Sequence, residues 1–291
     1  MIVATAPNVN GSVEATNAGV LSNRGVQGAV TVIPYSGGAF EWTTNASFTR
    51  NSSKVESLGD TTTRIAMGPS RFGVKLEAVK GQPFGSIVGT TFQRDAATGQ
   101  LILSNGLPLR EPMDTTVLGS MQPNWFGGVS NTLRYRNVEL SFLIDGQFGG
   151  SVFSATNMWG SVYGTLSETG FRPDTGLVIP GVDSSGQVNT THVSAEDYFH
   201  ALGMIAERWV YSASFVKLRE LRLGASFAVP NVAGFQNSRV EASLIGRNLA
   251  MWAKAPNIDP ESIISSSSYQ GFELGQPPRT RSFGVQITIV P

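Results

Sequence analysis

The residue types that could support hydrolytic chemistry lie close together in one stretch of the sequence. The chain has two histidines, His192 and His200, and Ser194 and Asp197 lie between them. A serine nucleophile, a histidine base and an orienting carboxylate could be drawn from this set. No Gly-x-Ser-x-Gly motif, which presents a nucleophilic serine in one large class of hydrolases, accompanies them. Ser194 followed by two acidic residues is more typical of a helix start, so we expect a helix over 194–205 and no catalytic residues.

Hard oxygen ligands are grouped at Asp259-Pro260-Glu261. Asp259 and Glu261 are therefore candidate calcium ligands. The alternative is a turn whose backbone is fixed by Pro260, and the turn is the favoured interpretation. No other metal site and no cofactor site is predicted.

Aromatic side chains are the remaining candidates for binding a ligand. Trp159 and Tyr163 lie next to a stretch rich in glycine and serine, and aromatic faces can stack on sugar rings, so these two are candidate substrate contacts. Trp209 and Trp252 lie near the ends of predicted strands, where an aromatic girdle at a membrane interface explains them better. Trp42 falls on the apolar side of its predicted strand.

Composition excludes several classes of protein. The chain has 291 residues, 21 basic and 21 acidic side chains and no cysteine. A disulfide framework, a zinc ribbon and a cysteine nucleophile are excluded, and zero net charge argues against a nucleic-acid-binding groove. No apolar stretch reaches membrane-helix length, and the first residues do not form a secretory signal. Only 14% of residues are charged and 33 are glycine, a composition typical of an outer-membrane β-barrel.

Alternation of apolar and polar residues predicts β-strands. In the segment 138–148, Val138, Leu140 and Phe142 share one face and Glu139 and Ser141 share the other. An irregularity near Arg219-Glu220 requires a β-bulge, with an amphipathic helix as the alternative. Two weaker strands are expected within 71–93. The seven predicted strands are 25–34, 39–50, 125–135, 138–148, 214–228, 239–248 and 281–290.

Short and long connections alternate between these strands. The short connections are 35–38, 136–137 and 229–238, and the long ones are roughly 51–124, 149–213 and 249–280. An outer-membrane barrel has short periplasmic turns and long extracellular loops, so the C-terminus is expected on the periplasmic side and residues 1–24 outside. A soluble β-sandwich is the alternative fold.

Specific motifs then resemble one known family, the TonB-dependent outer-membrane receptors of the SusC/RagA type. The matching motifs follow the family's order over nearly the whole chain. They are NRGVQG (23–28), GQPFGSIVG (81–89), PNWFGGVSNTLRYRNVELSF (123–142), SFVKLRELRLG (214–224), GRNL (246–249), DPE (259–261), QG (270–271) and RTRSFG (279–284). The chain departs from the family in Ala225, where an aromatic residue is common, and in its Ile289-Val290-Pro291 ending, which lacks a terminal aromatic residue.

The resemblance implies an all-β fold, an antiparallel transmembrane β-barrel. Such receptors are similar to 22-stranded barrels with an N-terminal plug. Residues 1–291 are expected to be the C-terminal portion, with about seven to nine strands and without the plug, the TonB box or a signal peptide. These strands could leave two open edges or close as a smaller barrel of about eight strands.

The resemblance also implies a function. The family imports oligosaccharides, glycans or peptides with a SusD-like lipoprotein partner, driven by TonB-ExbB-ExbD through the plug. The expected location is the lipid bilayer of a Gram-negative, Bacteroidetes-like outer membrane. The expected mechanism is binding and gated transport rather than catalysis. A soluble β-sandwich binding or adhesion protein and a hydrolytic enzyme are the alternative hypotheses.

Overall fold

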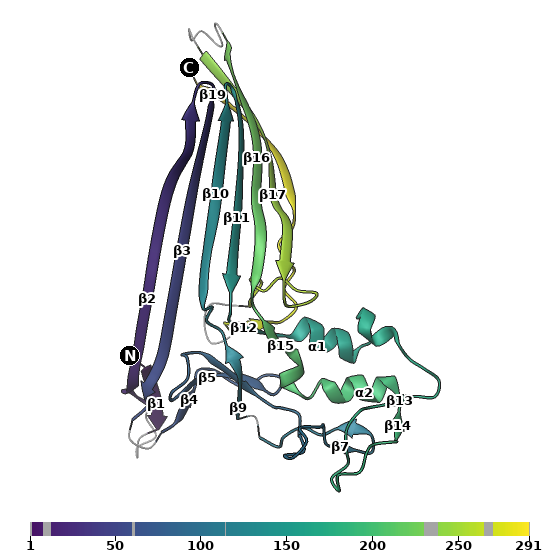
Figure 1. Ribbon diagram of the computed structural model, residues 1–291. Coiled ribbons are helices and arrows are strands. Elements are labelled where there is room, and N and C mark those ends of the chain that lie inside the picture. Colours follow the sequence, from purple (N-terminus) through teal and green to yellow (C-terminus); the bar gives the residue numbers. More distant parts are fainter. Residues whose placement is uncertain are drawn as a thin grey trace.

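The structure is a computed structural model, and it describes residues 2–7, 13–59, 62–113, 115–229, 238–264 and 270–290. One large sheet and a smaller folded unit at one end of it make up the molecule (Figure 1). Among the described residues, no helix has the length and apolar character needed to cross a membrane.

In the described part of the chain, the large sheet contains eight strands, each antiparallel to its neighbours and ordered as in the sequence. All seven predicted strands are present in it, and β1 is an eighth that was not expected from the sequence. The strands are β1 (Ile2–Pro7), β2 (Val13–Gly37), β3 (Phe40–Ser57), β10 (Trp125–Tyr135), β11 (Val138–Phe148), β16 (Phe215–Val229), β17 (Ser238–Ala253) and β19 (Ser282–Val290). Their order begins at β1 and ends at β19, so the described sheet is open and does not form the smaller closed barrel considered above.

Two tight turns join neighbouring strands at the same end of the sheet (Figure 1). Gly38, between β2 and β3, has a φ of +58°, and Arg136, between β10 and β11, has a φ of +54°. A left-handed backbone is what a short hairpin turn requires, and glycine adopts it without strain. The turn at 136–137 is confirmed, and the first hairpin is confirmed with its turn at 38–39 rather than 35–38, because β2 continues to Gly37. Most of the third predicted turn, 229–238, lies outside the described residues.

The register sorts the side chains of the sheet onto two faces. Residues directly opposite each other on neighbouring strands point to the same side. One continuous row is apolar: Leu133, Leu140, Leu223, Leu244 and Val285. The next row, on the other side, is polar: Arg134, Glu139, Gly224, Ser243 and Gln286. We call these sides the apolar face and the polar face.

A β-bulge interrupts β16 where the sequence predicted one. Its register shifts between Leu218 and Glu220 against β17, and the shift recurs against β11. The extra residue, Arg219, places Leu218 and Leu221 on the same face, although they are three positions apart. The bulge is confirmed and the alternative of an amphipathic helix is wrong.

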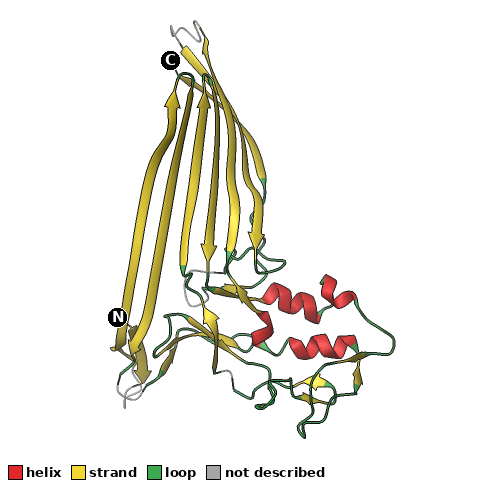
Figure 2. Cartoon of the chain, in the orientation of Figure 1, coloured by secondary structure: helices red, strands yellow, loops and turns green. Residues whose placement is uncertain are grey.

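The three long connections are folded rather than irregular. They form a unit at the end of the sheet opposite the tight turns, which we call the cap, and the helices of the described residues lie in it (Figure 2). One cap sheet contains β4 (Arg64–Ala66), β5 (Val74–Val79), β6 (Ser86–Gly89) and β9 (Thr116–Ser120), and another contains β12 (Ser151–Ser154), β15 (Val210–Ser212) and β18 (Phe272–Glu273). The remaining elements are β7 (Leu103–Ser104), β8 (Leu107–Pro108), α1 (Ala155–Val162), η1 (Ser167–Gly170), β13 (Leu177–Val178), β14 (His192–Val193), α2 (Ala195–Leu202) and η2 (Ala206–Trp209).

The two weak strands expected within 71–93 are therefore real but belong to the cap. They are β5 and β6, which pair with β4, β9 and each other and not with the large sheet. Both are buried on nearly every residue, which is why they lack the alternation of a membrane strand.

A hydrophobic core holds the cap together. It combines Leu76 and Ile87 from the first long connection, Phe153 and Trp209 from the second and Phe272 from the third. Each of these side chains is almost fully buried. The three connections therefore form one packed unit.

Candidate functional site

In the histidine and serine set, the Ser194 hydroxyl is engaged by Asp197. The Ser194 hydroxyl accepts a hydrogen bond from the Asp197 N–H at 3.0 Å and donates to the Asp197 carboxylate at 2.7 Å. Ser194 is thus the N-cap of α2, which confirms the predicted helix. His192 lies in β14 and His200 in α2, and both side chains are exposed.

The two aromatic substrate candidates lie on α1, in the cap. Trp159 packs edge-on against Phe72 with 5.3 Å between ring centres, and Tyr163, at the end of the helix, is 75% exposed. Tyr163 lines a pocket of about 230 Å³ between α1 and α2 together with Arg172 and His200. An exposed tyrosine beside a cation can bind a sugar or a peptide. Tyr163 and Trp159 therefore stay candidates for ligand contact.

The tryptophans predicted near the membrane interface lie in different environments. Trp209 is wholly buried in the cap core, and its indole N–H donates to the Leu202 carbonyl at 2.8 Å, so its assignment to a girdle is wrong. Trp252 is 63% exposed on the apolar face, opposite Val216. Trp42 also lies on the apolar face, opposite Leu133.

Asp259 and Glu261 are brought together with two cations. The Lys217 ammonium donates to Asp259 at 2.6 Å and to Glu261 at 2.5 Å. The Arg219 guanidinium, from the bulge, donates to Glu261 at 2.7 Å and to Asp145 at 2.6 Å. The side chains of Lys217 and Asp259 are only 4% and 3% exposed. We call these five residues the ionic cluster.

The chemistry of the ionic cluster is that of a closed ion-pair network. Desolvation by itself raises the pKa of Glu261, but the hydrogen bonds from Arg219 and Lys217 outweigh it and hold that pKa below its usual range. The oxygen atoms that a calcium ion would use are therefore occupied by cations. Among the described residues no group of three or more metal-ligand side chains is found. The Ser262 N–H donates to the Asp259 carbonyl at 2.9 Å, which confirms the turn that the sequence favoured over a calcium site.

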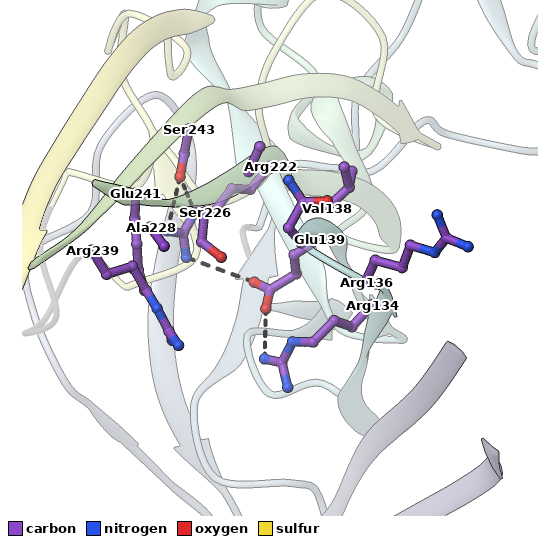
Figure 3. Close-up of a pocket in the computed structure, with 13 residues that line it drawn as sticks. Arg134, Arg136, Val138, Glu139, Arg222, Ser226, Ala228, Arg239, Glu241 and Ser243 are labelled. Atoms are coloured by element: carbon purple, nitrogen blue, oxygen red, sulfur yellow. Dashed lines mark hydrogen bonds and ion pairs between the residues drawn. The ribbon is translucent and has the colours of Figure 1, made fainter. Parts of the chain in front are cut away.

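A cavity that was not predicted from the sequence lies on the polar face near the tight turns. It has a volume of about 630 Å³ and is lined by arginines and glutamates from β10, β11, β16 and β17 (Figure 3). Arg134 donates to Glu139 at 2.8 Å, and Arg222 donates to the Ser243 hydroxyl at 2.9 Å. The sequence signal was a run of charges on the polar parity of four separate strands, which becomes a cluster only once the register is known.

A second feature missed from the sequence is the buried carboxylate of Glu273. Its side chain is fully buried and accepts hydrogen bonds from the hydroxyls of Ser154 at 2.8 Å and Thr156 at 2.6 Å and from the Gly275 N–H at 2.6 Å. Ser154 is the N-cap of α1, so Glu273 fixes the start of the helix that carries Trp159 and Tyr163. The neighbouring sequence contains no motif that indicates this role.

Comparison with known proteins gives two sequence relatives in one class. No family model matches the chain. TonB-dependent receptor P3 of Formosa agariphila is 24% identical over 303 residues, which cover 94% of this chain and 29% of that receptor. TonB-dependent receptor P26 of the same organism is 25% identical over 309 residues, with the same coverage. The chain thus spans less than a third of the length of these curated relatives.

Solved structures show the same fold. A chain in the structure of the RagAB peptide importer in the closed-closed state matches 99% of this chain with a TM-score of 0.64 and 16% identity, covering 32% of its own length. A chain in the structure of the RagAB peptide transporter matches 98% with a TM-score of 0.64 and 17% identity, covering 31%. These proteins are named as receptors and transporters, not as enzymes. In sequence this chain is similar to a portion of two TonB-dependent receptors, and in fold it is similar to a portion of the matched chains in the RagAB structures.

Proposed function

We propose that this chain forms part of the wall of an outer-membrane TonB-dependent transporter, with the cap on the extracellular side. The observation that carries the proposal is the apolar face, whose side chains point away from the polar face over six neighbouring strands. A monomeric soluble protein rarely exposes an apolar surface that extends over so many strands.

The central part of the apolar face carries no charged side chain. On β11 it presents Leu140, Phe142 and Ile144, and the bulge keeps β16 in phase so that Leu218 and Leu221 join them. The edge strand β19 adds Phe283, Val285, Ile287 and Ile289, each more than half exposed. A lipid bilayer stabilises such an apolar surface. A charge placed here would lose its hydration, which explains why charged side chains are not found on it in the described part of the chain.

Aromatic side chains border this apolar band at both ends. Near the tight turns, Tyr35 packs against Phe40 with 5.7 Å between ring centres. Near the cap, Trp125 stacks on Phe148 at 4.1 Å and packs against Phe48 at 5.7 Å. The eight steps from Phe40 to Phe48 along β3 span roughly 26 Å at about 3.3 Å per residue, close to the height of about 25 Å of the lipid-facing band of such barrels.

The opposite side fits the wall of a water-filled lumen. The polar face carries the arginine and glutamate cavity near the turns and the ionic cluster near the cap. In the proposed transporter, oligosaccharides, glycans or peptides would enter past the cap, and Trp159 and Tyr163 are the proposed contacts. RagAB, a peptide importer with a similar fold, supports an import role for a protein with this fold.

The proposed partners follow from the family resemblance. They are a SusD-like lipoprotein on the extracellular side and TonB-ExbB-ExbD acting through a plug, in a barrel of which residues 1–291 supply one portion. The proposed host is a Gram-negative bacterium of the Bacteroidetes type, as Formosa agariphila relatives suggest. Aromatic ligand contacts on the cap suit a glycan as well as a peptide.

A charge placed on either face of β10 tests the proposal. Val129 and Ser130 are neighbours midway between Trp125 and Tyr135, and they lie on the apolar and the polar face respectively. Val129→Lys should destabilise the lipid-inserted chain by about 2–4 kcal/mol, while Ser130→Lys should have little effect. Urea unfolding of the chain refolded into phospholipid vesicles measures both.

The soluble alternatives make the opposite prediction. A β-sandwich binding or adhesion protein would be recovered from cells without detergent and would bury Val129 inside, so that Val129→Lys would be harmful in buffer alone. Equal effects of the two lysines in vesicles, or folding of the unmodified chain in buffer without lipid, would contradict the membrane assignment.

A further inference from the structure

The connection between β17 and β19 contacts both the large sheet and helix α1. Its first part, residues 254–264, reaches the ionic cluster on the polar face, and its second part contains Phe272 and Glu273 in the cap. We call residues 254–264 together with 270–275 the strap.

The attachment to the sheet is ionic, and its Lys217–Asp259 pair is buried. Asp259 and Glu261 of the strap receive hydrogen bonds from Lys217 and Arg219 of β16, and Arg219 also holds Asp145 of β11. The aromatic ring of Phe215 lies 4.7 Å from the Lys217 ammonium and covers it. Ion pairs on an exposed surface contribute little to stability, but a buried ion pair with several hydrogen bonds holds its side chains in a single geometry.

The attachment to the cap is made through the start of α1. The Asn157 side-chain amide donates to the Pro256 carbonyl at 2.9 Å, and the Asn257 amide donates back to the Asn157 carbonyl oxygen at 2.9 Å. Asn157 is 1% exposed and both polar ends of its side-chain amide are used in this paired contact, whereas Pro256 and Asn257 are exposed. Glu273 adds the hydrogen bonds to Ser154 and Thr156 at the first turn of the same helix.

The two attachments are very close in the sequence. Asn257 contacts α1 and Asp259 contacts Lys217, with a single residue between them. A movement of β16 relative to the cap must therefore either carry α1 with it or break one of these contacts.

We propose that the strap fixes the position of α1, and with it Trp159 and Tyr163, relative to the strands β11 and β16. The positioning residues are Asp259, Glu261 and Asn257. Lys217 and Arg219 of β16 bind the two carboxylates, and Asn157 of α1 binds Asn257. A displacement of β11 and β16 is therefore transmitted through the strap to Trp159 and Tyr163. A displacement of these two aromatic residues is transmitted back to the strands in the same way. The role of the aromatic pair as ligand contacts rests on the proposed function, whereas the mechanical coupling does not.

A distance measurement between spin labels tests the coupling directly. The chain has no cysteine, so two introduced cysteines define a unique pair of labels. Thr165→Cys lies just after α1, and Ser47→Cys lies on the polar face of β3; both side chains are exposed and outside the ionic cluster. The distance distribution, measured by pulsed electron resonance on the full chain in detergent micelles, is expected to be narrow.

The strap variant Asp259→Asn/Glu261→Gln should broaden that distribution roughly twofold, because a released segment opens locally. The matched control is Glu220→Gln, which removes the exposed 3.0 Å ion pair with Arg247 from the same strand and should leave the distribution unchanged. Asn257→Ala keeps every charge paired and should also broaden the distance distribution. This variant can therefore test the proposal if the double variant does not fold.

An unchanged distribution in folded Asn257→Ala and Asp259→Asn/Glu261→Gln chains would overturn the proposal, as would equal broadening in Glu220→Gln. The measurement needs neither lipid insertion nor transport. Failure of the strap and failure of the proposed transporter role are therefore separate results.

Discussion

Trp209 organises the cap through a single buried side chain. Its ring lies in the core with Phe153 and Phe272, its N–H donates to the Leu202 carbonyl, and the Arg208 guanidinium lies 5.0 Å from the ring centre. In the sequence it stands beside a strand end, as Trp252 does, and local sequence has no signal that separates an interfacial tryptophan from a core one. Only the packing of three distant connections around Trp209 decides its role.

Removing the Trp209 side chain should therefore loosen the whole cap. Trp209→Ala is expected to cost about 3–5 kcal/mol of cap stability, because it leaves a cavity and an unpaired Leu202 carbonyl. Hydrogen exchange of cap amides in the detergent-solubilised chain measures the loss of protection. Trp252→Ala, at an exposed site on β17, is the control and should leave those amides protected. Equal exchange in the two variants would show that Trp209 does not hold the cap.

At the scale of elements, the sequence predicts what its periodicity encodes. The seven long strands and the bulge were predictable because one face of each strand is apolar and the other polar. Helix α2 was predictable from Ser194 and the acids that follow it, whereas α1 has no acid in its first turn and was not predicted. Of the cap strands only β5 and β6 were expected, and only as weak strands, because residues that are buried on nearly every position show no alternation.

The bulge in β16 predicts a different direction for two leucine side chains than strict alternation would. Leu218 and Leu221 should both face lipid, although their odd separation would place them on opposite faces of a regular strand. Introduced as single cysteines in vesicles, both should resist a water-soluble maleimide. Leu140 and Leu143 of β11 have the same spacing without a bulge, so Leu143→Cys should react and Leu140→Cys should not. Opposite reactivity at positions 218 and 221 would exclude the bulge.

At the scale of the molecule, contacts between distant segments decide the architecture. Asn157 meets Asn257 across 100 residues, and Ser154 meets Glu273 across 119. No local pattern signals either contact, because each residue alone resembles an ordinary loop or cap residue. The sequence thus predicts the wall, the turns and the alternation of short and long connections, but not that the long connections pack into one cap or that the strap links this cap to the wall.

The open sheet has a consequence for the behaviour of the isolated chain. Among the described strands β19 pairs only with β17, and its outer edge exposes Phe283 and Val285 by 80% and 70%. An unpaired, apolar edge strand recruits another strand, so the chain should associate with itself as its concentration in detergent rises. Analytical ultracentrifugation measures this. Further strands of a longer barrel would remove the tendency by pairing with β19.

Charges on the edge should weaken this association, because lysines carried on two copies repel each other as their edges approach. Gln286→Lys/Thr288→Lys adds two positive charges on the polar face of β19. Ser130→Lys/Ser141→Lys adds the same charge to the central strands β10 and β11 and is the matched control. The edge variant should remain monomeric at concentrations where the control and the unmodified chain associate. Equal association of both variants would show that contacts other than the β19 edge join the copies, and a monomeric unmodified chain would show that detergent alone protects it.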